Sequence, residues 1–207
     1  MSGNPRKEGP SVSETVEYYN SNSRAFIRET EAVDLSALHA RFLADLPYPA
    51  RILDAGSGAG RDALEFKHRG HEVFAIDASI KMVESTRHLA AVPTEHTRFL
   101  DYSPGHQFDG IWACASLLHV PMERLPVTLN HMAGLLRPGG TMFTSFKLGT
   151  SEGIRDGRFY RDLDQSLFEN LVEQLPTLTI RDVWITGDNR PERVNEFWLN
   201  GLLIKHE

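Results

Sequence analysis

The apolar and polar residues of this chain follow two alternating spacings. Short apolar runs predict strands, and the segments between them carry apolar residues at helical spacing. Five strands are expected in the first 150 residues and two in the remainder. Their ranges are 51–54, 71–77, 98–101, 108–114, 141–146, 178–186 and 196–205.

Helices are predicted before and between these strands. Asp34 can cap a helix that carries Leu38 and Phe42 on one face and ends before Pro47. Ser79 can cap the helix that follows the second strand. Further helices are expected near residues 61–70, 125–136 and 167–175.

Strands that are regularly separated by helices predict an α/β fold, with a doubly wound, Rossmann-like and mostly parallel sheet of seven strands. Only residues 187–195, which begin with the turn-rich segment 187–191, lie between the last two strands. These two strands are therefore expected to pair as a C-terminal antiparallel hairpin at one edge of the sheet.

The length of 207 residues suits one domain. Residues 1–13 are polar and rich in turn formers, so we expect a flexible tail there. The domain is then expected over residues 14–207, with an N-terminal helical region at 14–46. No segment has the apolar core of a signal peptide or the length of a membrane span, and Cys114 has no second cysteine to pair with. A cytoplasmic location is expected.

Charge adds one exclusion. The formal net charge is -6 at pH 7, which gives no electrostatic reason to expect tight binding to nucleic acid or to an anionic membrane. The sequence also lacks an evident cluster of acidic and amide side chains for a hard metal ion, so metal independence is expected.

The candidate chemistry begins at residues 51–62, which read RILDAGSGAGRD. An apolar strand runs into Asp54, three glycines alternate with single residues, and helix-forming sequence follows. This order lets a ligand approach the backbone closely at the carboxyl edge of an open sheet. The second strand ends at Asp77, and an acid in that place suits a ribose with two free hydroxyls.

Three ligand classes compete for such a loop. A Walker phosphate loop needs Gly-Lys-Ser/Thr, but Gly60 is followed by Arg61 and Asp62. The dinucleotide pattern needs glycine where Arg61 stands. Asp54 would repel a pyrophosphate and attract a cationic amino acid moiety. A purely structural glycine turn remains an alternative.

The arrangement D-x-G-x-G-x-G, with an acid at the end of the next strand, resembles class I S-adenosylmethionine-dependent methyltransferases. Later segments extend the resemblance over most of the chain. They are FLD at 99–101, FDGIWACASLLHV at 108–120 and LLRPGG at 135–140. A narrower resemblance, to small bacterial tellurite-resistance-type methyltransferases, rests on SFKLG at 145–149, GRFY at 157–160 and EFWLN at 196–200.

The resemblance implies S-adenosyl-L-methionine as the cofactor and assigns residues to its parts. The methionine portion is expected to contact Asp54, Gly56, Ser57, Gly58 and Gly60. The ribose is expected to contact Asp77, and the adenine Ala78, Asp101 and Tyr102. Cys114 and Ala115 are expected near the sulfonium. Arg61 either binds the cofactor carboxylate or is a solvated residue of the first helical turn.

The N-terminal region and one histidine complete the expected site. In similar proteins the N-terminal region folds over the cofactor as a lid, which would bring Tyr19 to the ligand; packing of an aromatic helix face is the alternative. His119 is the candidate general base if the acceptor must lose a proton. A structural histidine at a helix start is the alternative for it.

The acceptor is less well defined. Basic and aromatic residues that follow the fifth strand and precede the last one could bind an anion. We expect Lys147, Arg158, Tyr160 and Arg193 to contact the substrate. The alternative is a scattered set of solvated cations.

Several acceptor classes can be compared at this point. Enzymes that methylate DNA bases carry an Asn/Asp-Pro-Pro-aromatic run after the fourth strand, and residues 113–116 read ACAS instead. The sequence therefore predicts methyl transfer to a small molecule, with a small anionic acceptor as the favoured hypothesis. A tRNA or protein methyltransferase, or a non-catalytic module that binds S-adenosylmethionine, remains an alternative.

Overall fold

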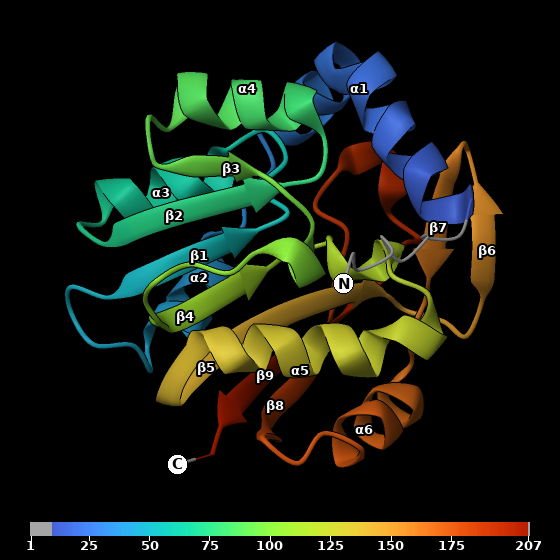
Figure 1. The fold of residues 1–207 in the computed structure, drawn as a ribbon. Coiled ribbons are helices and arrows are strands. Elements are labelled where there is room, and N and C mark those ends of the chain that lie inside the picture. The colour runs from blue at the N-terminus through green and yellow to red at the C-terminus, as the bar shows by residue number, and fades with distance from the viewer. Residues whose placement is uncertain (1–9, 207) are drawn as a thin grey trace, which may run out of the picture.

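A seven-stranded sheet forms the centre of the computed structural model, which describes residues 10–206 (Figure 1). The strand order is β3-β2-β1-β4-β5-β9-β8. Strands β1 to β5 run parallel, and β9 is antiparallel to both of its neighbours. The strands are β1 (Arg51–Ala55), β2 (Glu72–Asp77), β3 (Thr94–His96), β4 (Phe108–Ala113), β5 (Leu136–Lys147), β8 (Leu178–Gly187) and β9 (Phe197–Lys205). The predicted fold class is confirmed.

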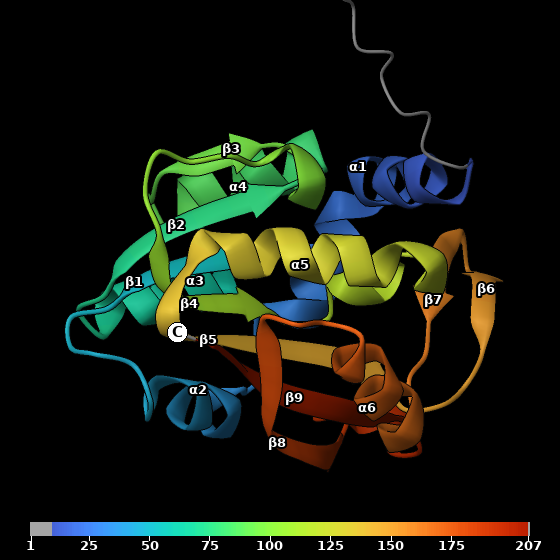
Figure 2. The same ribbon diagram turned by 60° about the horizontal axis from the view of Figure 1, so that its bottom comes forward.

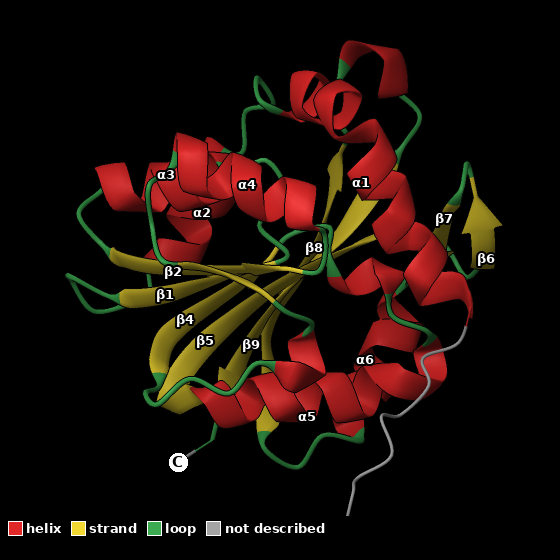
Figure 3. Ribbon diagram, turned by 45° about the horizontal axis from the view of Figure 1, so that its top comes forward, coloured by secondary structure: helices red, strands yellow, loops and turns green. Residues whose placement is uncertain are grey.

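Helices cover both faces of this sheet. Figure 3 shows α2, α3 and α4 on one face and α5 and α6 on the other. Helix α1 lies apart from these layers, at the end of the sheet toward which β1, β2 and β4 point (Figure 1). The helices are α1 (Pro10–Thr30), α2 (Ser36–Leu43), α3 (Arg61–His68), α4 (Ile80–Leu89), α5 (Leu125–Leu135) and α6 (Gln165–Glu173).

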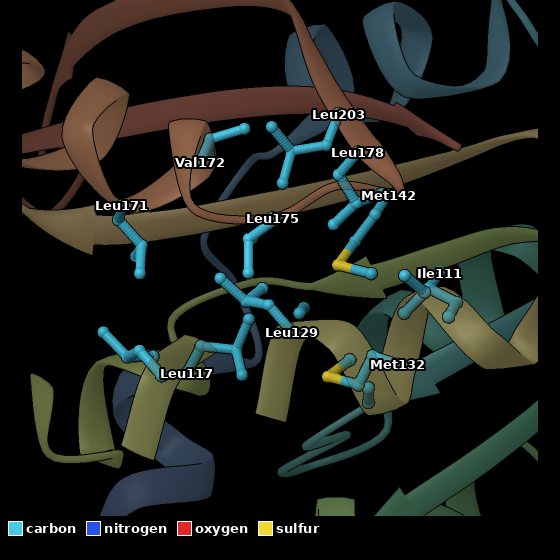
Figure 4. Packing of buried hydrophobic residues seen from close by; sticks show 14 of the residues in the cluster. Ile111, Leu117, Leu129, Met132, Met142, Leu171, Val172, Leu175, Leu178 and Leu203 are labelled. Atoms are coloured by element: carbon cyan, nitrogen blue, oxygen red, sulfur yellow. The ribbon is translucent and has the colours of Figure 1, made fainter. Parts of the chain in front are cut away.

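Apolar side chains fill the space between the sheet and each helical layer. Figure 4 shows Met132 of α5 and Leu171 of α6 facing residues of β4, β5 and β9. On the other face, Trp112 stacks on Phe143 with ring centroids 4.0 Å apart, and both are fully buried. All six residues of β4 are buried, as expected for a strand covered on both faces.

Local capping agrees with the sequence at one of the two predicted helix starts. The side chain of Ser79 accepts a hydrogen bond from the backbone N–H of Met82, which starts α4 as predicted. The carboxylate of Asp34 accepts a hydrogen bond from the backbone N–H of Ser36, at the start of α2. The N-cap residue of α2 is nevertheless Leu35, without a side-chain cap, so the predicted cap at Asp34 is wrong by one residue.

Two further predictions about local structure are wrong. The third strand is Thr94–His96, whereas Phe99–Asp101 form a short 3-10 helix. This strand is a short, polar edge strand paired only with β2, so no apolar run marks it. Residues 10–13 of the expected tail begin α1, where Pro10 suits the first helical turn. The remainder of the expected tail, residues 1–9, lies outside the described residues.

The sequence reading missed a β-hairpin after β5. Strands β6 (Glu152–Arg155) and β7 (Arg158–Arg161) pair as a separate two-stranded sheet. Asp156 and Gly157 between them have φ angles of 49° and 75°, as a tight hairpin turn requires. Figure 2 shows the hairpin beside α1. The backbone N–H of Phe159 donates to the hydroxyl of Thr15 at 2.9 Å, so the hairpin supports the helix.

Candidate functional site

A cavity of about 440 Å³ lies where β1, β2 and β4 end, beneath α1. Within the sheet, β2 lies next to β1 on one side and β4 lies next to β1 on the other, so the strand order reverses at β1. Open α/β sheets bind ligands at such a reversal of strand order. The cavity therefore occupies the place that the fold makes available for a ligand.

The glycine loop forms one wall of the cavity. Gly56 has φ +82°, and a Cβ atom on it would lie 2.4 Å from Cβ of Ser116. Gly58 has φ +53°, and a Cβ atom on it would lie 3.3 Å from the ring of Phe26 in α1. These positions need glycine both for their backbone angles and for the close approach. The loop thus presents bare backbone to the cavity, as its sequence predicted.

Asp77 ends β2 beside the loop and lines the cavity. Its two carboxylate oxygens accept hydrogen bonds from the backbone N–H groups of Gly58 at 2.9 Å and Ser79 at 2.8 Å. Burial raises the pKa of Asp77 to about 6. The carboxylate is held rigidly in place, and its remaining lone pairs are available to a ligand.

A buried charged network lies behind the loop. Asp62 accepts two hydrogen bonds from Arg61, at 2.8 and 3.0 Å, and one from the indole N–H of Trp112 at 2.9 Å. Arg61 also donates to the backbone carbonyl of Thr30 at 2.9 Å. Arg61 is therefore neither a solvated residue nor a free cation; it joins the end of α1 to the start of α3.

Asp54 is buried below the same loop, and its Oδ2 atom makes no hydrogen bond to any described residue. Burial and the nearby Asp62 raise the pKa of Asp54. Tyr102 is also buried, with its ring stacked near Phe108 at 6.4 Å, and Asp101 borders a separate hollow beside His96. The structure does not place Asp54, Asp101 or Tyr102 on the wall of the main cavity.

His119 lies on the cavity wall with both ring nitrogens engaged. Its Nδ1 atom is 2.6 Å from the carbonyl oxygen of Phe159, which can only accept, so Nδ1 carries the proton. Its Nε2 atom, 2.9 Å from the hydroxyl of Tyr19, then accepts the hydrogen bond. Burial lowers the pKa of His119 to about 4, and burial raises the pKa of Tyr19. The pair connects α1 to β7 in a neutral form.

The predicted substrate residues meet at one end of the cavity. Lys147 and Arg193 share the carboxylate of Glu196, the second at 3.7 Å. The Cζ atom of Arg158 lies 5.2 Å from the ring centroid of Tyr160, which in turn is 5.6 Å from Nζ of Lys147. The structure brings all four residues together, although they come from three segments of the chain.

Most of the predicted cofactor residues also line this cavity. Those that do are Tyr19, Gly56, Ser57, Gly58, Arg61, Asp77, Ala78, Cys114 and Ala115. Gly60 instead precedes α3 with φ +90°, where a Cβ atom would lie 2.7 Å from Cα of Thr86. Burial raises the pKa of Cys114 to about 12, so its thiol stays protonated.

Sequence reasoning missed several residues of the wall. Ser145 on β5 donates to the Sγ atom of Cys114 at 3.7 Å and accepts from the backbone N–H of Ala115 at 2.8 Å. Trp198 and Asn200 on β9 also line the cavity. Ser145 pairs directly with Asn200 across the sheet. The segments SFKLG and EFWLN contain these residues, but the sequence assigned them no role, because the insertion of β9 beside β5 creates their position.

Comparison with solved structures identifies the architecture. The chain superposes on the 1,6-didemethyltoxoflavin-N1-methyltransferase of Burkholderia thailandensis, crystallised with 1,6-didemethyltoxoflavin and S-adenosylhomocysteine, with a TM-score of 0.75. The two share 22% identity over 99% of this chain and 94% of that one, which is a likeness of fold. The fold is that of the methyltransferases.

Sequence comparisons support the same family. Residues 52–140 match the family model of the methyltransferase domain. An uncharacterized methyltransferase of Staphylococcus carnosus is 26% identical over 94% of this chain and 88% of its own. The tRNA 5-carboxymethoxyuridine methyltransferase of Escherichia coli K12 is 27% identical over 51% of this chain and 44% of its own. Together these findings support a class I methyltransferase and the cofactor that the sequence predicted.

Two further features are absent from residues 10–206. In this part of the chain no helix combines the length and apolar character needed to cross a membrane. Over the same residues, no three side chains among His, Cys, Asp and Glu come together in a way that could hold a metal ion.

Proposed function

We propose that this protein binds S-adenosylmethionine in the cavity beneath α1 and transfers its methyl group to a small molecule. The observation that carries the proposal is the joint position of the glycine loop and Asp77 at the reversal of strand order. Gly56 and Gly58 have backbone angles and close neighbours that exclude a Cβ atom, so bare backbone lines the cavity there, and Asp77 offers fixed acceptor oxygens. The residues present fit the cofactor.

Different parts of the cavity would bind different parts of the cofactor. Asp77 would accept hydrogen bonds from the ribose hydroxyls, and the loop at Gly56 and Gly58 would hold the methionine portion. Cys114 and Ala115, which directly follow β4, line the cavity and would lie near the sulfonium. Bound S-adenosylmethionine supplies a methyl group on a positively charged sulfur. The contribution of the protein is alignment of the two reactants and exclusion of water.

Calorimetry with S-adenosylmethionine tests the proposal. We expect binding by the unmodified protein and about 10- to 100-fold weaker binding by Asp77→Asn, because a hydrogen bond to a charged group is worth roughly 1.5–3 kcal/mol. Asp156→Asn is the matched control: it makes the same chemical change at the exposed turn of the hairpin. No detectable binding by the unmodified protein, or equal affinity in Asp77→Asn, would contradict the proposal.

A tRNA methyltransferase is the alternative enzyme, supported by the partial match to the Escherichia coli tRNA enzyme. The net charge of -6 argues against it. Filter binding with bulk tRNA at low salt separates the two. Retention of tRNA that weakens steeply with added salt would favour the tRNA enzyme, and no retention favours a small acceptor. A protein acceptor would be revealed by labelled methyl groups that remain with the protein fraction of an extract.

A module that binds S-adenosylmethionine without turnover is the alternative outside enzyme classes. It predicts normal calorimetry but no homocysteine release in a screen over small acids, thiols, amines and chalcogen oxyanions. The chalcogen oxyanions in this screen also test the narrower resemblance to tellurite-resistance-type methyltransferases. That resemblance and the cytoplasmic location stay predictions from the sequence.

A further inference from the structure

A cluster of cations surrounds Tyr160 at the acceptor end of the cavity. We define the cationic cluster as Lys147, Arg155, Arg158 and Arg193. Tyr160 has Arg155 at 4.7 Å, Arg158 at 5.2 Å and Lys147 at 5.6 Å from its ring centroid. The cluster shares two carboxylates, from Glu196 and Asp162. Four cations with two carboxylates leave a positive site in a chain whose net charge is -6.

Arg158 differs from the other members of the cluster. No carboxylate among the described residues pairs with it, and its Nε atom is buried without a hydrogen-bond partner there. Its Cζ atom lies 4.5 Å from the ring centroid of Tyr18 and 5.9 Å from that of Tyr19. Three tyrosine rings thus surround the guanidinium, which also donates a side-chain hydrogen bond to Tyr19. Its Nε–H group, which no described residue accepts, is left for an anion.

The carboxylates that line the cavity are already engaged. Asp62 binds Arg61, Asp188 binds Arg190 with its pKa lowered to about 2, and Asp34 accepts from the backbone N–H of Ser36. Asp77 accepts from two backbone amides and faces the glycine loop. None of these four is placed to take a proton from a substrate bound at the cationic cluster.

His119 is engaged as well. Its surroundings are Tyr19 from α1, Tyr160 and Arg158 from β7, and the carbonyl of Phe159. To act as a base, Nε2 would have to give up the hydroxyl of Tyr19 and become charged near Arg158. Its pKa of about 4 leaves it a weak base at neutral pH. The geometry assigns His119 to positioning α1, in place of the base role expected from the sequence.

We infer that the methyl acceptor is a carboxylate that enters already ionised, binds Arg158 and is converted to its methyl ester. This inference rests on the proposed methyltransferase function. A carboxylate has two oxygens, so one can remain on the guanidinium while the other attacks. Alcohols and protonated amines must lose a proton before or during transfer, and among the described residues no acid or histidine of the cavity is placed to take it.

The reaction balances without a proton. The carboxylate oxygen forms a bond to the methyl carbon, the bond from that carbon to sulfur breaks, and its electron pair stays on sulfur. The negative acceptor and the positive sulfur both become neutral. Release of a neutral ester from a positive site follows, because its attraction to Arg158 is lost.

The test uses the full chain saturated with S-adenosylhomocysteine and calorimetry with matched probes. The probes are benzoate and benzamide, hexanoate and hexanamide, and indole-3-acetate and indole-3-acetamide. We expect at least one carboxylate to bind more tightly than its amide, and Arg158→Ala to weaken that carboxylate by about tenfold or more. Arg28→Ala, which removes an exposed cation from α1 outside the cavity, should leave its affinity unchanged.

Three outcomes would overturn the inference. They are failure of every carboxylate to bind, equal binding of acids and amides, and equal carboxylate affinity in Arg158→Ala. Binding of S-adenosylhomocysteine is measured first, so its failure would reject the proposed function itself. For any probe that turns over, mild alkali should release the transferred methyl group as methanol. A methyl group that resists alkali indicates an ether or amine product and contradicts ester formation.

Discussion

Asp77 is the residue on which cofactor binding depends most directly. Its carboxylate holds the glycine loop through Gly58 and the start of α4 through Ser79, and it also faces the cavity. Burial among these elements raises its pKa to about 6. The same carboxylate therefore organises the loop and changes charge within an accessible range of pH.

This raised pKa predicts a pH dependence of binding. Ribose hydroxyls donate to the ionised form, so the affinity for S-adenosylhomocysteine should be constant above about pH 7. It should fall by up to about tenfold per pH unit below pH 6, as Asp77 takes up a proton in the free protein. Calorimetry between pH 5 and 8 measures this profile.

Asp77→Asn supplies the control for the pH profile. This variant has no titrating group at position 77, so its weaker affinity should not change between pH 5 and 7. A fall in affinity with the same midpoint in the variant would assign the titration to another group. His119 is not expected to contribute, because its pKa of about 4 lies below this range.

At the residue scale, the sequence predicted the parts of the site that lie within one continuous segment. The glycines and Asp77 belong to one strand-turn-helix-strand unit, so their spacing in the sequence predicted that they lie together. The positions of Asp101 and Tyr102 depend on the path of the chain after β2, which their spacing in the sequence does not fix. Residues 99–101 form a 3-10 helix there. His119 was located correctly on the cavity wall. Its two hydrogen-bond partners come from α1 and β7, which no spacing in the sequence connects to it.

At the element scale, α1 is fastened over the cavity at several points along its length. Thr15 and Tyr19 bind β7 and His119, and the side chain of Asn20 accepts from the hydroxyl of Ser79 at 2.7 Å. Thr30 accepts from Arg61. The helix is kinked at Asn22, where φ and ψ are −111° and 15°. Two helical halves thus lie over different parts of the cavity.

These contacts predict that ligand binding slows amide hydrogen exchange in α1. S-adenosylhomocysteine would contact Tyr19 and the loop at Gly58, so opening of α1 would cost the binding energy as well. We expect slower exchange in residues 14–30 at saturating ligand, measured by mass spectrometry. Helix α6 contributes no described residue to the cavity wall and serves as the internal control. Equal slowing in α1 and α6 would reject a lid role for α1.

The hairpin of β6 and β7 has a turn signal in the sequence, although the hydrophobic periodicity did not predict its strands. Its strands are four residues long, and the bulky side chains of 158–161 are also compatible with a loop. The Asp156-Gly157 dipeptide is the usual signal of a two-residue hairpin turn. That dipeptide predicts the hairpin of β6 and β7. It does not predict that the hairpin packs on α1.

At the scale of the whole molecule, strand β9 connects the two halves of the architecture. It lies between β5 and β8, and α6 packs on its middle. A Cβ atom on Gly201 would lie 2.4 Å from Cζ of Phe168 in α6. The mostly parallel sheet was predictable because consecutive βα units favour one, and the terminal hairpin because only a turn separates its strands. The strand order and the insertion of β9 between β5 and β8 were not predicted.

The close contact at Gly201 predicts a large effect on stability. Gly201→Ala should lower the free energy of unfolding by roughly 1–3 kcal/mol, because α6 must move away from the sheet. Gly187→Ala is the matched control in the neighbouring strand, where nothing lies within 4 Å of the added Cβ atom. Its effect should stay within about 0.5 kcal/mol. Urea unfolding followed by circular dichroism measures both, and equal losses would show that the contact with Phe168 is readily relieved.

The position of β9 also has a consequence for biosynthesis. The glycine loop and Asp77 are made early, but Trp198 and Asn200 of the acceptor end belong to a strand that follows all others of the sheet in sequence. Domains begin to fold while the chain is still emerging. Until Phe197–Lys205 has emerged, β5 and β8 have no β9 to join them. During synthesis, the cofactor end of the cavity can therefore take shape before the end that selects the acceptor.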